Sequence, residues 1–370
     1  MYSVSSWRNR ERNFGLTNSN EHAAGKMTLH RRMCGTRADK VSKMRRRELF
    51  KLIGGAVVAW PLAGRAQPPN MPVVGFLNDG IAQHDYDLAA SFRQGLREAG
   101  FDAGQNVAIV ERWADGQYGR LSDLTADLID RKVSVIAAAF IQASLSARAG
   151  AGTTPVVFVT GSDPVRYGLV SSLNKPGGFT TGITTFNNVM GGKRLGLLRD
   201  LVPGLRTFAV LINPKQPEGQ ESYLEDLQSA ARALGMSLIA LPASTDGDID
   251  EAFAAMVNQK IGALLVMPDS FLSGRLNNIV TLAARHAIPT IYARPEAVPL
   301  GGLMSYATDL VDVFREQGTY VGRILKGEKP ADLPVLQPTN FKFLLNLKTA
   351  KALGLTIPSG MLAIADKVIE

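Results

Sequence analysis

Polar and aromatic side chains recur directly after the apolar segments that the sequence predicts to be β-strands. Carboxylates there could bind a ligand amine, an arginine could bind a ligand carboxylate through two parallel hydrogen bonds, and aromatic rings could enclose an apolar group. Parallel α/β sheets bind ligands at the carboxyl ends of their strands, where these residues are expected. The candidate ligand-binding residues are Asn78, Asp79, Phe140, Gln142, Ser144, Ser162, Asp163, Phe186, Asn213, Asp269, Phe271, Tyr292, Arg294 and Tyr306.

Each candidate also has a structural interpretation. Asp163 and Asp269 can cap helices or form loops, and Ser144 can cap its own helix. Arg294 can form an ordinary ion pair with Glu296, and the aromatic rings can belong to the core. It is the shared position at predicted strand ends that favours a binding site.

No catalytic constellation accompanies these residues. The first predicted strand leads into Gly75–Gly80, which lacks the G-x-G-x-x-G spacing of a dinucleotide site, and the sequence has no Walker A lysine. From Gln67 onward the only histidines are His84 and His286, so a transition-metal site has no obvious ligands. Ser162 lacks the second glycine of a nucleophile elbow. The sequence therefore predicts a protein that is not an enzyme and holds no cofactor or metal.

One stretch, from Thr154 to Thr184, predicts how the elements position a site. Val156–Val159 is a short β-branched run typical of a strand buried on both faces. Ser162 and Asp163 could cap a helix that begins at Pro164 and ends near Leu173. The glycines and proline at 176–178 then break the chain, and the segment 180–184 would carry it towards a second lobe.

From Pro72 onward, strand-like and helix-like segments alternate, and the pattern occurs twice. Because the offset between the copies is nearly constant, we expect two similar lobes. The matched landmarks are the strands Val73–Leu77 and Phe208–Ile212 (offset 135), the helices Leu88–Ala99 and Tyr223–Leu234, the glycines Gly100 and Gly235 (offset 135), and the pairs Thr154-Pro155 and Ile288-Pro289 (offset 134).

The 370 residues suffice for about two domains. We predict two Rossmann-like α/β lobes with parallel sheets joined by a hinge, with crossings near 184–188 and 305–309. Lobe 1 would comprise residues 72–184 and 310–330, and lobe 2 residues 185–305. Residues 331–370 would form a C-terminal connector and a helix that packs back on the lobes.

The first 66 residues differ from the rest in charge. They hold 14 Lys and Arg against 4 Asp and Glu, so the net charge of +8 leaves about −2 for the remainder, which removes the electrostatic argument for nucleic-acid binding. Within them, Arg45–Arg47, the apolar run Leu52–Leu62 and the small residues before Gln67 resemble a twin-arginine secretion signal spanning 44–66. The alternatives are a basic amphipathic helix and a retained membrane anchor.

Residues 1–43 are polar and are predicted to be a disordered upstream extension, with Met44 as the true start. The single cysteine, Cys34, lies in that extension. A secreted chain that begins at Gln67 would therefore have neither disulfides nor thiolate chemistry.

Several segments carry a more specific resemblance. The sequence resembles the substrate-binding proteins of ABC transporters, in particular the tryptophan and tyrosine transport binding proteins, over about residues 44–370. The segments are Phe92–Glu98 (FRQGLRE), Gly104–Val107 (GQNV), Gly161–Val165 (GSDPV), Pro176–Gly178 (PGG), Gly301–Tyr306 (GGLMSY) and Asn346–Leu355 (NLKTAKALGL).

This resemblance implies a type I periplasmic binding protein fold with a ligand held between the lobes. It also implies that Asp163 and the loops after Asn78, Ala139 and Met267 line the pocket. The expected partners are a small-molecule solute and an ABC permease with a cytoplasmic ATPase, and the expected form is a periplasmic monomer.

The sequence departs from the family pattern at the expected pocket. Phe140-Ile141 replaces a Thr-Pro pair, Phe179 replaces an asparagine, and Ala307 replaces a glycine. Phe140 would reshape the end that receives a ligand carboxylate. We expect a receptor that captures a small organic solute, an amino acid or an aromatic acid, by hinge closure. The alternative is a periplasmic sensor for a membrane signalling partner.

Overall fold

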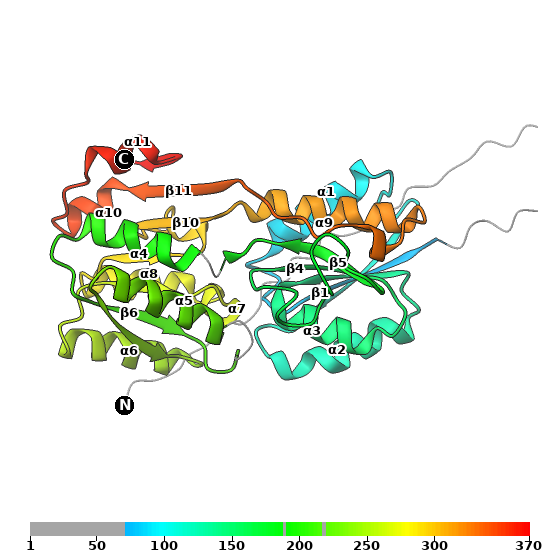
Figure 1. Cartoon of the computed structure of the whole chain (residues 1–370), viewed down its shortest axis with the longest axis horizontal. Coiled ribbons are helices and arrows are strands. Elements are labelled where there is room, and N and C mark those ends of the chain that lie inside the picture. Colours follow the sequence, from blue (N-terminus) through cyan, green and yellow to red (C-terminus); the bar gives the residue numbers. More distant parts are fainter. Residues whose placement is uncertain (1–70, 188–189, 217–219) are drawn as a thin grey trace, which may run out of the picture. The chain divides into compact units, whose positions relative to one another are not determined.

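The computed structural model describes residues 71–187, 190–216 and 220–370. The predicted upstream extension (1–43) and secretion signal (44–66) lie outside the described residues. The described part contains two α/β sheets with helices on their faces (Figure 1). None of its helices has the length and apolar character needed to cross a membrane.

The elements alternate along the chain as the sequence pattern predicts. The strands are β1 (Val73–Asn78), β2 (Ala108–Trp113), β3 (Val135–Ala139), β4 (Val156–Thr160), β5 (Thr180–Thr184), β6 (Thr207–Ile212), β7 (Ser237–Pro242), β8 (Leu264–Val266), β9 (Thr290–Tyr292), β10 (Met304–Thr308), β11 (Phe341–Asn346) and β12 (Lys367–Ile369). The helices are α1 (Tyr86–Glu98), α2 (Leu121–Asp130), α3 (Phe140–Gly150), α4 (Met190–Leu201), α5 (Gln220–Ala233), α6 (Asp246–Asn258), α7 (Ser270–Ser273), α8 (Leu276–Arg285), α9 (Leu310–Leu325), α10 (Leu347–Ala352) and α11 (Ser359–Ile364), with short 3-10 turns η1 (Tyr118–Arg120), η3 (Pro295–Ala297) and η4 (Pro330–Asp332).

The first sheet has the strand order β2-β1-β3-β4-β5, and all its strands are parallel. Helices α1 and α9 cover one face and α2 and α3 cover the other (Figure 1). Because both faces are covered, the central strands β3 and β4 are continuously apolar apart from Thr160 and are buried throughout. We call this sheet with its four helices lobe 1.

The second sheet has the order β12-β11-β10-β9-β8-β6-β7. Its portion β7-β6-β8-β9-β10 repeats the strand order of the first sheet, which confirms the two matching lobes expected from the sequence. Strand β11 then pairs antiparallel with β10, and β12 pairs parallel with β11. We call this sheet with its helices lobe 2.

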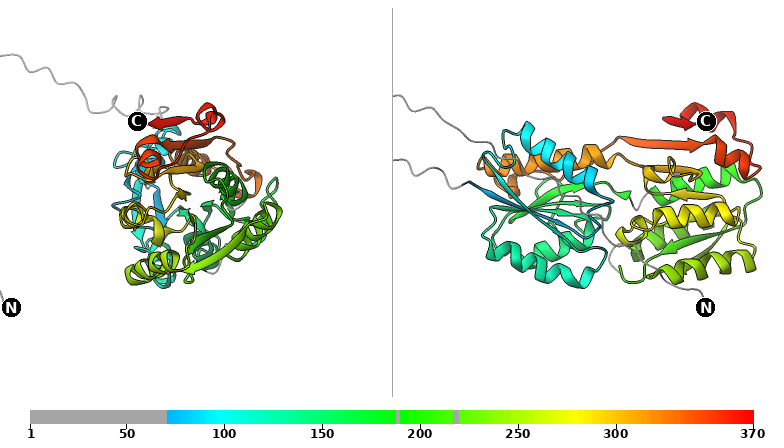
Figure 2. Two further views of the ribbon diagram at one scale, coloured as in Figure 1. Left: turned by 90° about the vertical axis from the view of Figure 1, so that its left-hand side faces the viewer. Right: turned by 180° about the vertical axis from the view of Figure 1, so that it is seen from behind.

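The chain passes between the lobes after β5, after β10 and after η4. Strand β10 of lobe 2 leads directly into α9, which lies beside α1 of lobe 1 in two opposite views (Figures 1 and 2). The last crossing runs along lobe 1 first, where the amide of Thr184 donates to the carbonyl of Leu336 over 2.9 Å. These crossings place the carboxyl ends of both sheets next to each other.

The prediction of a helix from Pro164 to Leu173 is wrong. Asp163 does accept hydrogen bonds from the amides of Val165 (2.8 Å) and Arg166 (3.3 Å), but only a run of turns follows. Gly168 has φ +69°, a left-handed conformation that ends a helix after its first turn. The strands β11 and β12 were not predicted either.

Candidate functional site

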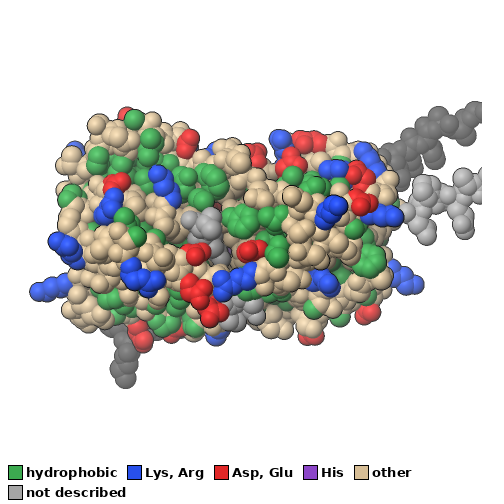
Figure 3. Space-filling model, viewed as in Figure 1, with side chains coloured by type: hydrophobic (Ala, Val, Ile, Leu, Met, Phe, Trp, Pro, Cys, Tyr) green, Lys and Arg blue, Asp and Glu red, His purple; other side chains and the backbone are tan. Residues whose placement is uncertain are grey.

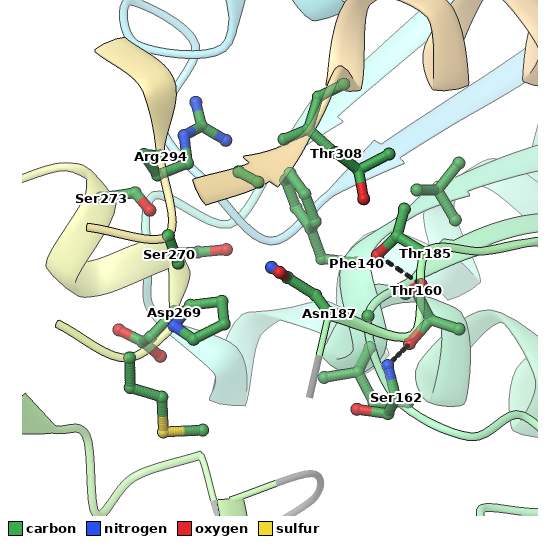
Figure 4. Close-up of a pocket in the computed structure, with 18 of the residues that line it drawn as sticks. Phe140, Thr160, Ser162, Thr185, Asn187, Asp269, Ser270, Ser273, Arg294 and Thr308 are labelled. Atoms are coloured by element: carbon green, nitrogen blue, oxygen red, sulfur yellow. Dashed lines mark hydrogen bonds between the residues drawn. The ribbon is translucent and has the colours of Figure 1, made fainter. Parts of the chain in front are cut away.

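A pocket lies at the carboxyl ends of the strands of both lobes, with a cavity of about 70 Å³ (Figure 4). This is where doubly wound sheets bind ligands, because the loops there are free to vary while the strands hold them in place. Lobe 1 contributes the loops after β1, β3, β4 and β5, and lobe 2 those after β6, β8, β9 and β10. The lining residues are Asp85, Phe140, Ile141, Val159, Thr160, Gly161, Ser162, Thr185, Asn187, Gln216, Met267, Pro268, Asp269, Ser270, Ser273, Ala293, Arg294, Ala307, Thr308 and Leu310.

Among the residues predicted from the sequence, Phe140, Ser162, Asp269 and Arg294 line this pocket. Phe140 is the first residue of α3 and has φ +69°, a conformation rarely adopted by a bulky side chain. Its ring packs edge-on against Phe314 of α9, with centroids 5.7 Å apart. The surrounding packing thus holds a strained backbone at the pocket wall, as is common at binding sites.

Asp79 and Asn213 lie directly behind the lining and support it. The hydroxyl of Ser270 donates a hydrogen bond to Asp79, and Asn213 Nδ2 donates to both carboxylate oxygens of Asp269 at 3.3 and 3.1 Å. Asn78 accepts from the amide of Gly80 over 2.7 Å and shapes the loop after β1. These side chains orient the pocket loops without lining the cavity.

Asp269 is the most densely bonded carboxylate of the site. Besides Asn213, it accepts from the amide of Leu272 (2.8 Å) and from the Tyr118 hydroxyl of lobe 1 (2.7 Å). It therefore caps the short helix α7 and connects the two lobes. Asp269 thus caps a helix and also lines the pocket, so both interpretations offered by the sequence apply to it.

Other candidates lie away from the lining. Asp163 is exposed and its carboxylate serves the turn described above. Ser144 is buried on α3, where its hydroxyl donates to the carbonyl of Phe140 over 2.5 Å. Gln142 is half-buried on the same helix, and its backbone amide faces Asp79.

The remaining aromatic candidates serve packing. Tyr292 is buried within β9, and Phe271 is buried beneath the guanidinium of Arg275, 4.0 Å from its ring. Tyr306 stacks on Phe341 with centroids 6.0 Å apart. Phe186 lies half-buried with φ +43° in the crossing after β5.

Sequence reasoning missed the hydroxyls that line the pocket at strand ends. Thr160 ends β4, Thr185 follows β5 and Thr308 ends β10. Within lobe 1, Thr160 Oγ1 accepts from the amide of Ser162 over 3.0 Å, and the Thr185 hydroxyl donates to the Thr160 carbonyl over 3.4 Å (Figure 4). A signal was available only for Thr160, a polar residue that closes an otherwise apolar strand, because β5 (TTGIT) and β10 (MSYAT) contain several polar residues.

Some buried polar atoms of the lining have no hydrogen-bond partner in the described part of the chain. They include Gln216 Oε1 and Thr308 Oγ1, whose residues are 6% and 3% exposed. Leaving such atoms unpaired destabilises a protein by about 1–3 kcal/mol each. A bound solute that hydrogen-bonds to them would remove this penalty, since both residues line the pocket.

The arginine of the pocket is neutralised by carboxylates. Arg294 Nη2 donates to Asp85 of lobe 1 over 3.1 Å, and Arg294 Nε lies 3.2 Å from Glu296. Both interpretations of Arg294 offered by the sequence are therefore correct, since it forms the ion pair with Glu296 and also lines the cavity. Burial raises the pKa of Asp85, although Arg294 opposes this.

Asp79 has a strongly perturbed carboxyl group. Burial raises its pKa from the ordinary 3.8 to about 8; the Ser270 hydrogen bond opposes this shift, and the nearby Asp269 and Asp85 add to it. Burial also raises the pKa of Asp269, against the hydrogen bonds that it accepts. Three buried carboxyl groups with raised pKa values, those of Asp79, Asp85 and Asp269, therefore lie together at the pocket.

Asp79→Asn is expected to flatten the dependence of stability on pH. Because the folded pKa of Asp79 is raised, its contribution to the free energy of unfolding is complete below about pH 4 and is lost as pH rises towards about 8. The slope is at most about 1.4 kcal/mol per pH unit. Asparagine keeps an acceptor for Ser270 but carries no charge. Denaturant unfolding at several values between about pH 5 and 8 measures the difference, and a variant with the wild-type slope would contradict it.

Among the described residues, no group of three or more His, Cys, Asp or Glu side chains is arranged to hold a metal ion. On the face shown in Figure 3, basic and acidic side chains are interspersed, so the described residues there form no single basic patch. The pocket is a small cavity lined by hydroxyls, amides, apolar side chains and the charged groups of Asp85, Asp269 and Arg294. Such a lining suits a small organic solute.

Comparison with known proteins agrees with this geometry. Residues 81–369 match the family described as ABC transporter substrate binding protein. The tyrosine-binding protein of Clostridioides difficile (strain R20291) is 24% identical over 264 residues, which cover 71% of this chain and 75% of the relative.

Two solved structures share this fold, and the alignment with each covers 80% of this chain and 99% of the other chain. One is a conserved domain protein from Vibrio cholerae, with 22% identity and a TM-score of 0.75. Another is an ABC domain from Streptococcus pneumonia in complex with L-Trp, with 24% identity and a TM-score of 0.73. The family match, which spans most of the sequence, confirms the resemblance read from the motifs: the chain belongs to the ABC transporter substrate binding proteins.

Proposed function

We propose that this binding protein captures an amino acid or an aromatic acid between its lobes and presents the closed form to a permease driven by a cytoplasmic ATPase. Its family binds solutes for ABC transporters rather than transforming them. A tyrosine-binding relative and a similar fold in complex with L-Trp support the finer choice of solute. The apolar wall of Phe140, Ile141 and Met267 would receive the ring.

The observation that carries this proposal is a set of hydrogen bonds that cross from one lobe to the other around the pocket. Tyr118 of lobe 1 donates to Asp269 of lobe 2 over 2.7 Å. In addition, Ser270 donates to Asp79, and Arg294 donates to Asp85. These bonds form only when the lobes are together, so a solute that touches both lobes shifts the equilibrium towards closure.

The place of action is part of the proposal. We propose a monomeric receptor outside the cytoplasmic membrane, exported through a cleaved twin-arginine signal at 44–66. The support is the sequence pattern of Arg45–Arg47 followed by an apolar run and small residues.

The test is a thermal-shift screen of the purified protein followed by calorimetry. We expect L-tyrosine, L-tryptophan or a related aromatic acid to raise the Tm, since a solute that binds only the folded state stabilises it. Dicarboxylates and sugars serve as comparison sets. If no amino acid or aromatic acid shifts the Tm but a sugar does, the receptor role stands and the solute class is wrong.

A further inference from the structure

Arg194 of α4 is a charged side chain that the proposed function does not yet use. It is fully buried, next to the crossing that follows β5. Its Nε donates to the carbonyl of Tyr306 over 2.8 Å and its Nη1 donates to the carbonyl of Asn187 over 3.2 Å. Its Nη2 donates to the side-chain oxygen of Asn187. One guanidinium therefore connects the crossing after β5 with strand β10.

The charge of Arg194 has no ionic partner in the described part of the chain. The oxygens that accept from it belong to carbonyl and amide groups, with the Tyr223 hydroxyl alongside, and none is a carboxylate. Arg294, in contrast, lies against two carboxylates. Burial lowers the pKa of Arg194 because it removes the guanidinium from water, although the nearby Tyr223 opposes this shift. An uncompensated buried cation is unfavourable unless a counter-charge arrives.

Asn187 connects this cation to the pocket. It lines the cavity, and Figure 4 shows its amide pointing into the cavity towards Ser270. Because Arg194 holds the side-chain oxygen, the NH₂ end of the amide is the part oriented to donate. A donor whose own oxygen accepts from a guanidinium is polarised, so it binds an anion more strongly than an isolated amide.

The other anion-binding position of such a fold is already filled. The first turn of a helix attracts carboxylates, and α3 begins at the pocket with Phe140. The carboxyl group of Asp79, however, faces the backbone amide of Gln142 in that turn. A carboxyl group of the protein itself thus occupies the place where a solute could bind.

We propose that the solute carries a carboxylate that accepts a hydrogen bond from Asn187, and that Arg194 is the residue that positions Asn187 and supplies the counter-charge. This inference rests on the proposed function and deepens it, because it assigns the acidic group of the solute to the crossing after β5. The ring or side chain of the solute then lies against Phe140, which is next to Asn187 on the lobe 1 side of the pocket (Figure 4).

Asn187→Asp tests the charge argument without any ligand. An aspartate at 187 supplies the missing carboxylate to Arg194, so the ligand-free protein is expected to gain about 3 °C in Tm. It is also expected to lose at least tenfold in affinity for an acidic solute, because like charges then meet in the pocket. The double variant with Arg194→Met should lose the gain in Tm. An Asn187→Asp variant that melts below the wild type would overturn the proposal.

Acid and amide pairs test the role of Arg194. The probes are L-tyrosine with L-tyrosinamide and 4-hydroxybenzoate with 4-hydroxybenzamide, measured by calorimetry. We expect the wild type to prefer the acid at least tenfold and Arg194→Met to abolish most of that ratio, while Arg194→Lys retains part of it. Arg199→Met, on the exposed side of the same helix, is the matched control for the substitution.

The outcomes separate the inference from the proposed function. An Arg194→Met variant that weakens acid and amide equally would show that Arg194 is only structural. A wild type that binds amides as tightly as acids would overturn the carboxylate assignment and leave the receptor role intact. A wild type that binds no acid, amide or sugar would overturn both.

Discussion

Asp269→Ala is expected to weaken solute binding by about a hundredfold, which corresponds to about 3 kcal/mol. The substitution leaves the Tyr118 hydroxyl and the Asn213 amide without their acceptor inside a buried site. It also removes the cap that accepts from the amide of Leu272, so the loop after β8 loses its orientation. Calorimetric Kd values for wild type and variant measure the loss.

Two further variants separate closure from local folding. Tyr118→Phe removes only the hydrogen bond from Tyr118 to Asp269, one of those between the lobes, and should weaken binding about fivefold, or about 1 kcal/mol. Asp163→Ala changes an exposed carboxylate that serves a turn away from the pocket, so it should leave the Kd within about twofold. Equal losses for Asp269→Ala and Asp163→Ala would mean that the crossing bonds do not contribute to binding.

The regular elements could be read from the sequence because their signals are local. Helix α2 spans Leu121–Asp130 and α9 spans Leu310–Leu325, and the buried residues of both recur with helical periodicity. Strand β11 (Phe341–Asn346) gave no such signal, because it mixes polar and apolar residues and owes its place to antiparallel pairing with β10. The helix expected at Pro164 failed because a single glycine conformation at Gly168 ends it.

The site could be predicted only as a set of loops. The ends of the predicted strands indicate which loops meet, because the carboxyl ends of parallel strands lie at the same edge of a sheet. Which side chain faces the cavity depends on the opposite lobe: Ser270 lines it while Asp79 lies behind, because the two bond to each other across the lobes. The role proposed for Arg194 was invisible for the same reason, since its partners are the carbonyl of Tyr306 and the amide of Asn187.

The contact between α1 and α9 decides where the crossing from lobe 2 enters lobe 1. The two helices lie side by side (Figure 2), and glycines on both allow their backbones to approach. A Cβ added at Gly318 would lie 2.1 Å from the carbonyl oxygen of Phe92, and one at Gly95 would lie 1.8 Å from that of Arg315. Since α9 begins at Leu310, which lines the pocket, this contact also sets the position of the pocket wall.

Gly318→Ala is therefore expected to destabilise the protein by about 3 kcal/mol, because the added methyl group meets backbone atoms that cannot rotate away. Separation of the helices would also disturb the buried bonds from Gln317 to the carbonyls of Ala138 (3.1 Å) and Val157 (2.9 Å), which fasten α9 to the first sheet. Denaturant unfolding monitored by circular dichroism gives the free energy. The matched control is Gly196→Ala on α4, where no heavy atom outside the neighbouring backbone of α4 lies within 4 Å of the new Cβ. That variant should gain about 0.5–1 kcal/mol from helix propensity alone. If Gly318→Ala and Gly196→Ala changed the free energy of unfolding in the same direction, the close approach of α1 and α9 would not be the reason for glycine at these positions.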